Sequence, residues 1–299
     1  MAGNTGDMGN TGNTGDMGST GNSGSAGIAG EFGGGWFIED RVDLPFVMEL
    51  DAANAPLRFK RVNRSSFGER AWAARWWASL VLHDFVATNW RATADPIMAT
   101  EWSTITTTAA ALEITALTLA ARDERAPAMG EILSQDVEFT TDFMALLAIT
   151  PGSHPNTYRV LHIASLIGSY AVLYYKGRYN RPRPSQLCPA LLPPIPMPGH
   201  ASWPSGHATQ AQLKALCMEH VLQGVLSGTL TTGDLGAVSS NLRTLALRVA
   251  RNREIAGLHY PTDSVAGRKL ADTIAPFFTG MGPTTWFGKA VTTAKAEWV

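Results

Sequence analysis

Three short stretches of the sequence carry side chains that could bind an anion and move protons. They are KGRYNRPRP (176–184), PGHASWPSGHAT (198–209) and RNREIAGLHYPTD (251–263). Cations neutralise an oxyanion, amide groups at the start of a helix bind it, and imidazoles exchange protons near neutral pH. Together the three stretches indicate an oxyanion site that uses histidine chemistry.

The cations of this site would come from two of the stretches. The first stretch has four cations within eight residues, Lys176 and Arg183 among them, and the third contributes Arg253. Arg181 and Arg183 each precede a proline, which disfavours helical backbone at the arginine. A solvated helix end, where cations complement the helix dipole, is the structural alternative for the first stretch on its own.

Pro204-Ser205-Gly206 predicts the start of a helix in the second stretch. Ser205 would cap this helix, and Gly206 would let the backbone approach a ligand closely. His207 would then lie in the first turn, close to the free amide groups. The structural alternative is an ordinary cap followed by a polar histidine.

The third stretch pairs a histidine with a carboxylate. Pro261 suits the first position of a helix, so Tyr260 is the expected cap and Asp263 the third helical residue. Asp263 could then reach back to His259, and a carboxylate beside an imidazole fixes its tautomer. Such a pair taken alone is more often structural.

These residues resemble the three-part signature of the superfamily of vanadium haloperoxidases and type 2 phosphatidic acid phosphatases. The signature reads Lys-x6-Arg-Pro, then Pro-Ser-Gly-His, then Ser-Arg-x5-His-x3-Asp. One position departs from it, since Asn252 stands where the signature has serine. The matching residues follow one another along the chain: Lys176, Arg183, Pro184, Pro204, Ser205, Gly206, His207, Arg253, His259 and Asp263.

The resemblance implies a role for each matching residue. His259 would be the axial ligand of vanadate, or the nucleophile toward phosphorus, and Asp263 would orient it. His207 would be the acid/base on the opposite, apical side. The residues that would bind the equatorial oxygens of vanadate or phosphate are Lys176, Arg183, Ser205, Gly206 and Arg253.

The resemblance also implies two activities. In a vanadium-dependent haloperoxidase, vanadate is the cofactor, and hydrogen peroxide oxidises a halide that reacts with an organic acceptor. In a soluble acid phosphatase, no cofactor is needed, and a phosphomonoester is hydrolysed through a phosphohistidine. Phosphate can occupy the vanadate site in either case. His200 favours the first activity, because similar bromide-oxidising enzymes carry histidine there and it could donate a hydrogen bond to peroxide; a polar loop residue is its structural alternative.

We therefore expect a bromide-oxidising vanadium haloperoxidase, with the acid phosphatase as the alternative. A zinc site made of His200, His207, His259 and Asp263 is a weaker alternative, since three converging cations oppose a divalent metal. Ser205 does not lie in a Gly-x-Ser-x-Gly elbow, which argues against a serine hydrolase. A non-catalytic helical module with a relic site is the remaining alternative.

Composition limits the other functions. The chain has 299 residues, 45% of them hydrophobic, and a net charge of −1, which does not favour a nucleic-acid partner. No apolar run reaches the roughly 18 residues of a membrane helix, so we expect a soluble protein that does not bind membranes. No signal peptide is visible, and both a cytoplasmic and an exported location stay open, as does a homodimer.

The chain divides into a leader and one domain. Residues 1–35 repeat a nine-residue Gly/Asn/Thr-rich motif and are expected to be flexible, whether native or derived from cloning. Residues 36–299 are expected to form a single helical catalytic domain. Its fold class is all-α, a bundle of about seven or more helices of the haloperoxidase and acid phosphatase type. The expected helices cover 70–92, 106–123, 136–149, 157–179, 206–226, 235–257 and 261–278, with a Pro-rich loop at 185–204.

Overall fold

The computed structural model describes residues 72–223, 225 and 232–298 of the chain. No residue in these ranges lies in a β-strand, and the expected all-α fold class is confirmed. Residues 73–298, where described, belong to one compact unit. The expected flexible leader and residues 36–71 lie outside the described ranges.

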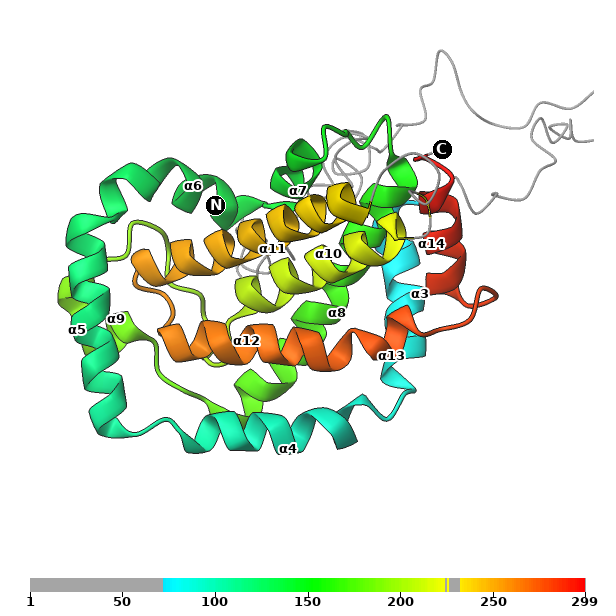
Figure 1. Ribbon diagram of the computed structural model, residues 1–299. Helices are drawn as coiled ribbons and strands as arrows, with labels where there is room; N and C mark the ends of the chain where they lie inside the picture. Colours follow the sequence, from blue (N-terminus) through cyan, green and yellow to red (C-terminus); the bar gives the residue numbers. More distant parts are fainter. Residues whose placement is uncertain (1–71, 224, 226–231, 299) are drawn as a thin grey trace, which may run out of the picture. The chain divides into compact units, whose positions relative to one another are not determined.

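Helix α8 (Pro155–Tyr179) is the central element of the bundle (Figure 1). It begins with proline at its first position, where the missing amide hydrogen costs nothing. Its buried side chains lie on nearly all sides, as expected of a broadly apolar helix surrounded by others. It ends at Asn180, which has a φ of 47° and turns the chain out of the helix.

Three further helices complete the centre: α10 (Gly206–Leu222), α11 (Thr232–Ile255) and α12 (Pro261–Ile274). Helix α10 packs against α8, α11 and α12, and Figure 1 shows it between the other two C-terminal helices. Almost every side chain of α10 is buried. Such burial on several faces lets one helix hold the other three in register.

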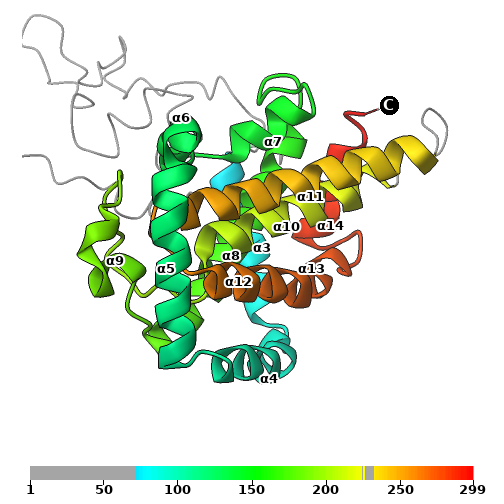
Figure 2. The same ribbon diagram turned by 60° about the vertical axis from the view of Figure 1, so that its left-hand side comes forward.

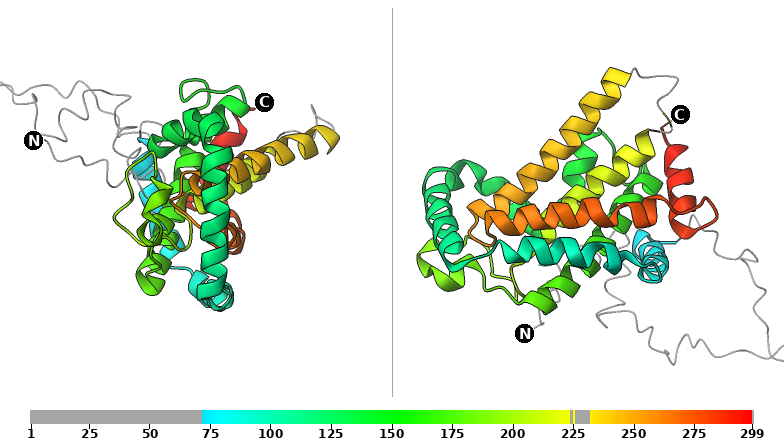
Figure 3. Two further views of the ribbon diagram at one scale, coloured as in Figure 1. Left: turned by 90° about the vertical axis from the view of Figure 1, so that its left-hand side faces the viewer. Right: turned by 60° about the horizontal axis from the view of Figure 1, so that its bottom comes forward.

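Other helices cover this centre. Helices α3 (Ala74–Val86) and α14 (Trp286–Lys295) pack on α8, and the short α13 (Pro276–Thr279) joins α12 to α14. Helix α4 (Trp90–Ser103) lies along α12, as the right-hand view of Figure 3 shows.

Three further helices pack over the end of the bundle where α11 leads into α12. Helix α5 (Thr107–Asp123) stands across it, and α6 (Arg125–Val137) and α7 (Thr140–Leu146) follow (Figure 2). Both α5 and α6 contact α11. The segment between α8 and α10 has only two short helical pieces, α9 (Pro184–Leu187) and a 3₁₀ turn at Pro189–Leu191. This agrees with the Pro-rich loop expected at 185–204.

Several of the expected helices are wrong in their bounds. The helix expected over 206–226 ends at Leu222, and the helix expected over 261–278 is interrupted at Ala275 between α12 and α13. The helix expected over 70–92 ends at Val86, and α4 starts a new helix at Trp90. The helix expected over 136–149 is divided, because the carboxylate of Glu138 accepts hydrogen bonds from the amides of Thr140 and Thr141 and so begins α7. Helices α6 and α14, and α4 beyond residue 92, have no counterpart among the expected helices.

Within the described residues, no single helix has both the length and the apolar content to cross a membrane. Helices α4 and α5 pass that test only as a pair, and they are bent by 81° relative to each other.

Candidate functional site

Four helix ends meet where the sequence motifs lie. They are the last turn of α8, the first turn of α10, the last turn of α11 and the first turn of α12. Backbone hydrogen bonds join the three motifs directly. The amide of Ser202 donates to the carbonyl of Arg181 at 2.9 Å, and the amide of Ser205 donates to the carbonyl of Asp263 at 3.0 Å. The motifs are therefore adjacent in space although they are up to 87 residues apart in sequence, from 176 to 263.

Lys176 is buried at the end of α8, with 2% of its surface exposed. Its Nζ donates to the carbonyl oxygens of Ala201 at 2.5 Å and Ser202 at 2.9 Å. Burial, and then the charge of Arg183, lower the pKa of Lys176 well below its usual range. The two carbonyls accept hydrogen bonds from the ammonium group but bring no compensating charge. Because Lys176 is buried, the alternative of a solvated helix end is wrong here.

Arg183 is equally buried, with 1% exposed. Its Nε donates to the carbonyl of His200 at 3.0 Å, and its Nη1 donates to the carbonyl of Leu258 at 3.0 Å. Burial lowers the pKa of Arg183 to about 10, which leaves it charged at neutral pH. Like Lys176, it is held in place by uncharged acceptors.

Arg253 is fully buried in the last turn of α11. Its Nη2 donates to the carbonyl of Ile132 at 2.6 Å, and its Nη1 lies 3.5 Å from a carboxylate oxygen of Asp136. Its Nε is buried without a hydrogen-bond partner. A buried, charged N–H group without an acceptor is costly, and an anion in the site would supply the acceptor.

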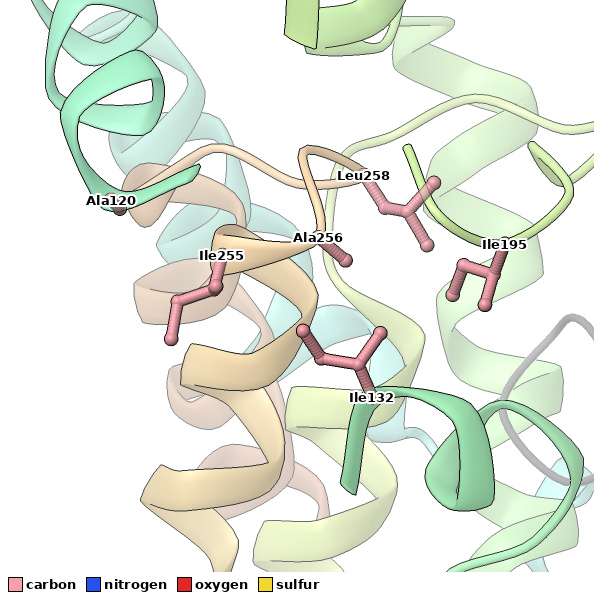
Figure 4. Close-up of a cluster of buried hydrophobic side chains, with 6 residues drawn as sticks. All are labelled: Ala120, Ile132, Ile195, Ile255, Ala256 and Leu258. Carbon is pink, nitrogen blue, oxygen red and sulfur yellow. The ribbon is translucent and has the colours of Figure 1, made fainter. Parts of the chain in front are cut away.

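A cluster of apolar side chains fixes two of the carbonyls that hold these arginines (Figure 4). Ile132 of α6 and Leu258, just beyond α11, both belong to it. Their carbonyls receive Arg253 and Arg183 respectively. The members of the cluster are Ala120, Ile132, Ile195, Ile255, Ala256 and Leu258. Close packing of this kind resists small displacements, so it gives the two guanidinium groups a rigid base.

Ser205 begins α10 as the sequence predicts. Its side chain accepts a hydrogen bond from the amide of Ala208 at 3.4 Å, and Gly206 is the first helical residue. Gly267 of α12 allows the close approach of this helix start, since a Cβ added there would lie 2.6 Å from the carbonyl oxygen of Ser205. The amide end of α10 therefore has a defined place beside the cations.

His259 and Asp263 form the pair that the spacing suggests. Tyr260 is the residue before α12, Pro261 is its first residue, and Asp263 is its third. The Nδ1 of His259 donates to Oδ2 of Asp263 at 3.1 Å, and the amide of Tyr260 donates to the same oxygen at 3.1 Å. Nδ1 therefore carries the hydrogen and Nε2 carries the lone pair.

The environment of His259 is strongly positive. Burial lowers the pKa of His259 well below its usual range. The groups whose charges lower it further are Arg183, Lys176, His200 and Arg253. Arg183, Lys176 and Arg253 are thus close enough to His259 to act on it, and the imidazole is neutral near pH 7.

His207 lies in the first turn of α10 and is also buried. Its Nε2 donates to the carbonyl of Gln135 at 3.0 Å, and its ring stacks on Phe139 with centroids 5.2 Å apart. Burial, followed by the charge of Arg253, lowers the pKa of His207 well below its usual range. The ring is therefore neutral, with the lone pair on Nδ1.

His200 is half-buried and contacts the anion-binding residues. Its Nδ1 lies 3.1 Å from Nη2 of Arg183 and 3.2 Å from the carbonyl oxygen of Ala201. The structure thus brings all nine expected site residues to this end of the bundle.

Arg181, a further residue of this region, was not assigned a role from the sequence. Its guanidinium ion-pairs with Asp263 at 2.6 Å and with Glu113 of α5 at 3.0 Å. The Arg181-Pro182 pair beside Arg183-Pro184 was visible in the sequence, but nothing there showed which carboxylate it would reach.

Asn252 stands where the signature has serine, and its side-chain amide bonds to α6 and not to the anion-binding residues. Its Nδ2 donates to Glu131 at 2.8 Å and to Gln135 at 2.9 Å, and so ties α11 to α6. Gln135 is the residue whose carbonyl holds His207. The departure from the signature therefore supports His207 indirectly.

The residue types fit an oxyanion better than a metal cation. Among the described residues there is no group of three or more His, Cys, Asp and Glu side chains that could hold a metal ion. The cations and the unpartnered Nε of Arg253 instead suit the oxygens of vanadate or phosphate. His259 would hold vanadate through Nε2.

Comparison of the chain with models of known protein families and with curated proteins finds no match.

Proposed function

We propose that this protein is a vanadate-dependent haloperoxidase that oxidises bromide with hydrogen peroxide. The observation that carries the proposal is the excess of buried positive charge around His259. Lys176 and Arg183 have uncharged acceptors, and the carboxylate that acts on both of them, Asp263, is already bonded to Arg181. Burying charges in this way is unfavourable by several kcal/mol per ion unless an anion compensates them.

The cations and the start of α10 would bind that anion. Guanidinium groups form strong, directional hydrogen bonds with tetrahedral oxyanions, and helix amides add further donors. The Nε of Arg253 would gain the acceptor that it lacks. Because these groups are already held by carbonyls, little reorganisation accompanies binding.

His259 would bind the central atom of the anion through Nε2. Its bond to Asp263 keeps the hydrogen on Nδ1, and its low pKa keeps Nε2 unprotonated. Vanadate bound there would act as a Lewis acid that activates hydrogen peroxide toward halide. The protein groups contribute binding, orientation and the movement of protons.

His207 suits the role of a general base. Its hydrogen is on Nε2, so Nδ1 can accept a proton from hydrogen peroxide as the peroxide enters. A neutral imidazole is ready for this step, whereas protonating a leaving group would need it charged.

A soluble acid phosphatase is the second candidate, and the unprotonated Nε2 of His259 favours it. That atom could attack phosphorus directly and form a phosphohistidine. A bound phosphate dianion would raise the pKa of His207, which could then protonate the leaving oxygen. His207 would next deprotonate the water that releases phosphate.

A paired assay tests both candidates. Protein loaded with vanadate is given hydrogen peroxide and bromide and assayed for bromination of a diketone dye, and protein without vanadate is given an aryl phosphate. We expect bromination by the wild type, none by His259→Ala, and little change in His83→Ala, whose exposed ring lies on α3. Hydrolysis without bromination would select the phosphatase, and unchanged activity in His259→Ala would reject both.

Anion binding can also be measured without turnover. Titration with inorganic phosphate in buffers of different ionisation enthalpy reports proton exchange on binding. Because burial and the charge of Arg253 lower the pKa of His207 in the absence of the anion, and a bound anion would raise it, we expect net proton uptake by His207 on binding near pH 7. Binding without proton uptake would contradict this account of the electrostatics.

A further inference from the structure

The side chain of Arg181 lies on the opposite side of Asp263 from His259. Its Nη1 donates to Oδ1 of Asp263 at 2.6 Å, while Oδ2 accepts from His259 at 3.1 Å. Both Arg181 and Asp263 are buried, with 4% and 0% of their surface exposed. The carboxylate therefore has one oxygen for the arginine and the other for the histidine.

Arg181 is itself held by Glu113. Its Nη2 donates to Oε2 of this α5 residue at 3.0 Å, and its Nη1 also donates to the hydroxyl of Thr262 at 2.8 Å. Glu113 additionally accepts hydrogen bonds from the amide of Thr262 at 2.7 Å and from its hydroxyl at 3.0 Å. Glu113 thus holds both Arg181 and the first turn of α12, which carries Asp263.

An aromatic ring completes the surroundings of this arginine. The guanidinium carbon lies 3.6 Å from the centroid of Tyr260, the residue between His259 and α12. Cations are attracted to the face of such a ring. Arg181 is therefore held by two carboxylates, a hydroxyl and a ring.

From this arrangement we infer that Arg181 is a positioning residue for His259, acting through Asp263 and held in place by Glu113. By occupying Oδ1, Arg181 keeps the carboxylate in the orientation in which Oδ2 faces Nδ1 of His259. That hydrogen bond leaves Nε2 as the atom directed to the anion. The inference rests on the proposed function only in so far as activity is one of its readouts.

Turnover of Arg181→Met gives the first readout. This substitution removes the guanidinium but keeps an unbranched side chain, and we expect kcat/KM to fall about 100-fold, less than the roughly 10⁴-fold lost when the aspartate of a catalytic triad is replaced. Arg178→Met is the matched control, because Arg178 lies in the same stretch but is exposed and pairs with Asp95. We expect the control to stay within twofold of wild type.

A double-mutant cycle separates positioning from general support of the fold. If Arg181 acts through Asp263, adding Arg181→Met to Asp263→Asn should lower kcat/KM by less than threefold further. If the fold-loss in kcat/KM of the double variant equals the product of the two single-variant losses, the inference is overturned. Arg181→Lys keeps the positive charge on a single donor nitrogen. Its kcat/KM should be at least tenfold higher than that of Arg181→Met.

The tautomer of His259 provides a readout without activity. In protein labelled with ¹⁵N-histidine, the wild type should show the hydrogen of His259 on Nδ1, and Arg181→Met should show a mixture of tautomers. An unchanged spectrum together with unchanged kcat/KM would overturn the inference. If the wild type shows neither activity, the proposed function fails, and the spectrum alone decides on Arg181.

Glu113→Gln provides a second variant in case Arg181→Met does not fold. It keeps the shape of Glu113 and the Arg181 side chain but removes the charge that holds the guanidinium. We expect a fall in kcat/KM of about threefold to tenfold and a partial change in the His259 spectrum. A folded Glu113→Gln protein with neither change would contradict the role of Glu113 and, with an unfolded Arg181→Met, the inference as a whole.

Discussion

The side-chain amide of Asn252 donates a hydrogen bond to Oε1 of Gln135 at 2.9 Å. The same amide nitrogen donates to Glu131 at 2.8 Å, so both of its hydrogens are used. The carbonyl of Gln135 in turn accepts a hydrogen bond from His207. The position at which the third motif departs from its signature therefore helps to hold the proposed base.

Replacing Asn252 by the serine of the signature should lower both the stability of the fold and the activity. Serine has one hydrogen to donate and a shorter side chain, so the buried Oε1 of Gln135 loses its donor. We expect the free energy of unfolding to fall by about 1–2 kcal/mol and kcat/KM to fall several-fold, measured by urea unfolding and steady-state kinetics. Asn156→Ser is the control: it breaks a bond to Glu297 far from the site and should leave kcat/KM unchanged.

Gly267→Ala should displace the start of α10. The added Cβ would meet the carbonyl oxygen of Ser205 at 2.6 Å, and a backbone atom cannot move aside cheaply. We expect the free energy of unfolding to fall by about 1–3 kcal/mol and phosphate to bind more weakly. Gly130→Ala has no atom within 4 Å of its Cβ and should show neither effect. Full phosphate affinity in Gly267→Ala would argue against binding at this helix start.

Ile132→Ala should loosen Arg253 by opening a cavity in the cluster of Figure 4. Truncating a buried isoleucine costs about 2–5 kcal/mol, and the carbonyl of the same residue holds the guanidinium. Phosphate affinity should therefore fall together with stability. Leu133→Ala, at the exposed neighbouring position, is the control and should change little. A destabilised Ile132→Ala protein with unaltered phosphate affinity would show that the cluster does not support the site.

His162 should make the fold sensitive to acid. It is fully buried, neither ring nitrogen has a hydrogen-bond partner, and burial lowers its pKa to about 3. Because the unfolded state binds a proton near pH 6.5 and the folded state does not, stability is lost as the pH falls from about 6.5 toward about 3. His162 alone should remove about 2 kcal/mol between pH 7 and pH 5.

Urea unfolding at the two pH values measures this loss. His207 and His259 have pKa values shifted in the same direction, so they should add to it. His162→Phe should reduce the difference between the two pH values, and the exposed His83→Ala should not. An equal difference in His162→Phe and wild type would exclude His162 as a source.

His200→Ala should slow bromide oxidation by about tenfold, the size of effect expected from one hydrogen bond. It removes the ring that contacts Nη2 of Arg183 and that would donate a hydrogen bond to peroxide. Measuring phosphate affinity alongside bromination separates these two effects. If affinity falls and the turnover of fully loaded protein stays unchanged, His200 acts by holding Arg183 and not on peroxide.

Local sequence signals predicted much of the framework of the site. Pro204-Ser205-Gly206 begins α10 and Pro261 begins α12 as expected, because a capping hydroxyl and a fixed proline φ act within a few residues. The His259–Asp263 bond follows from the same local geometry, since the third residue of a helix can reach back to the residues just before it. The all-α fold class followed from long apolar stretches without strand alternation.

Contacts between distant segments could not be predicted in this way. The amphipathic pattern of α6 is short, and nothing in the sequence pairs its carbonyls with Arg253 and His207, which are more than seventy residues away. Arg181 illustrates the same limit, because a cation in a crowded stretch has several carboxylates within reach until the helices pack.

The sequence by itself determined which residues supply charge, amide groups and imidazole, and where their helices begin, because caps, prolines and side-chain chemistry act locally. Tertiary structure alone decided that Lys176, Arg183 and Arg253 are buried around His259. Uncharged carbonyls hold Lys176 and Arg183, and a carbonyl together with Asp136 holds Arg253. The physical reason is that burial depends on what the other helices cover. The same charges on a solvated helix end would be screened by water, whereas in this bundle they favour an anion.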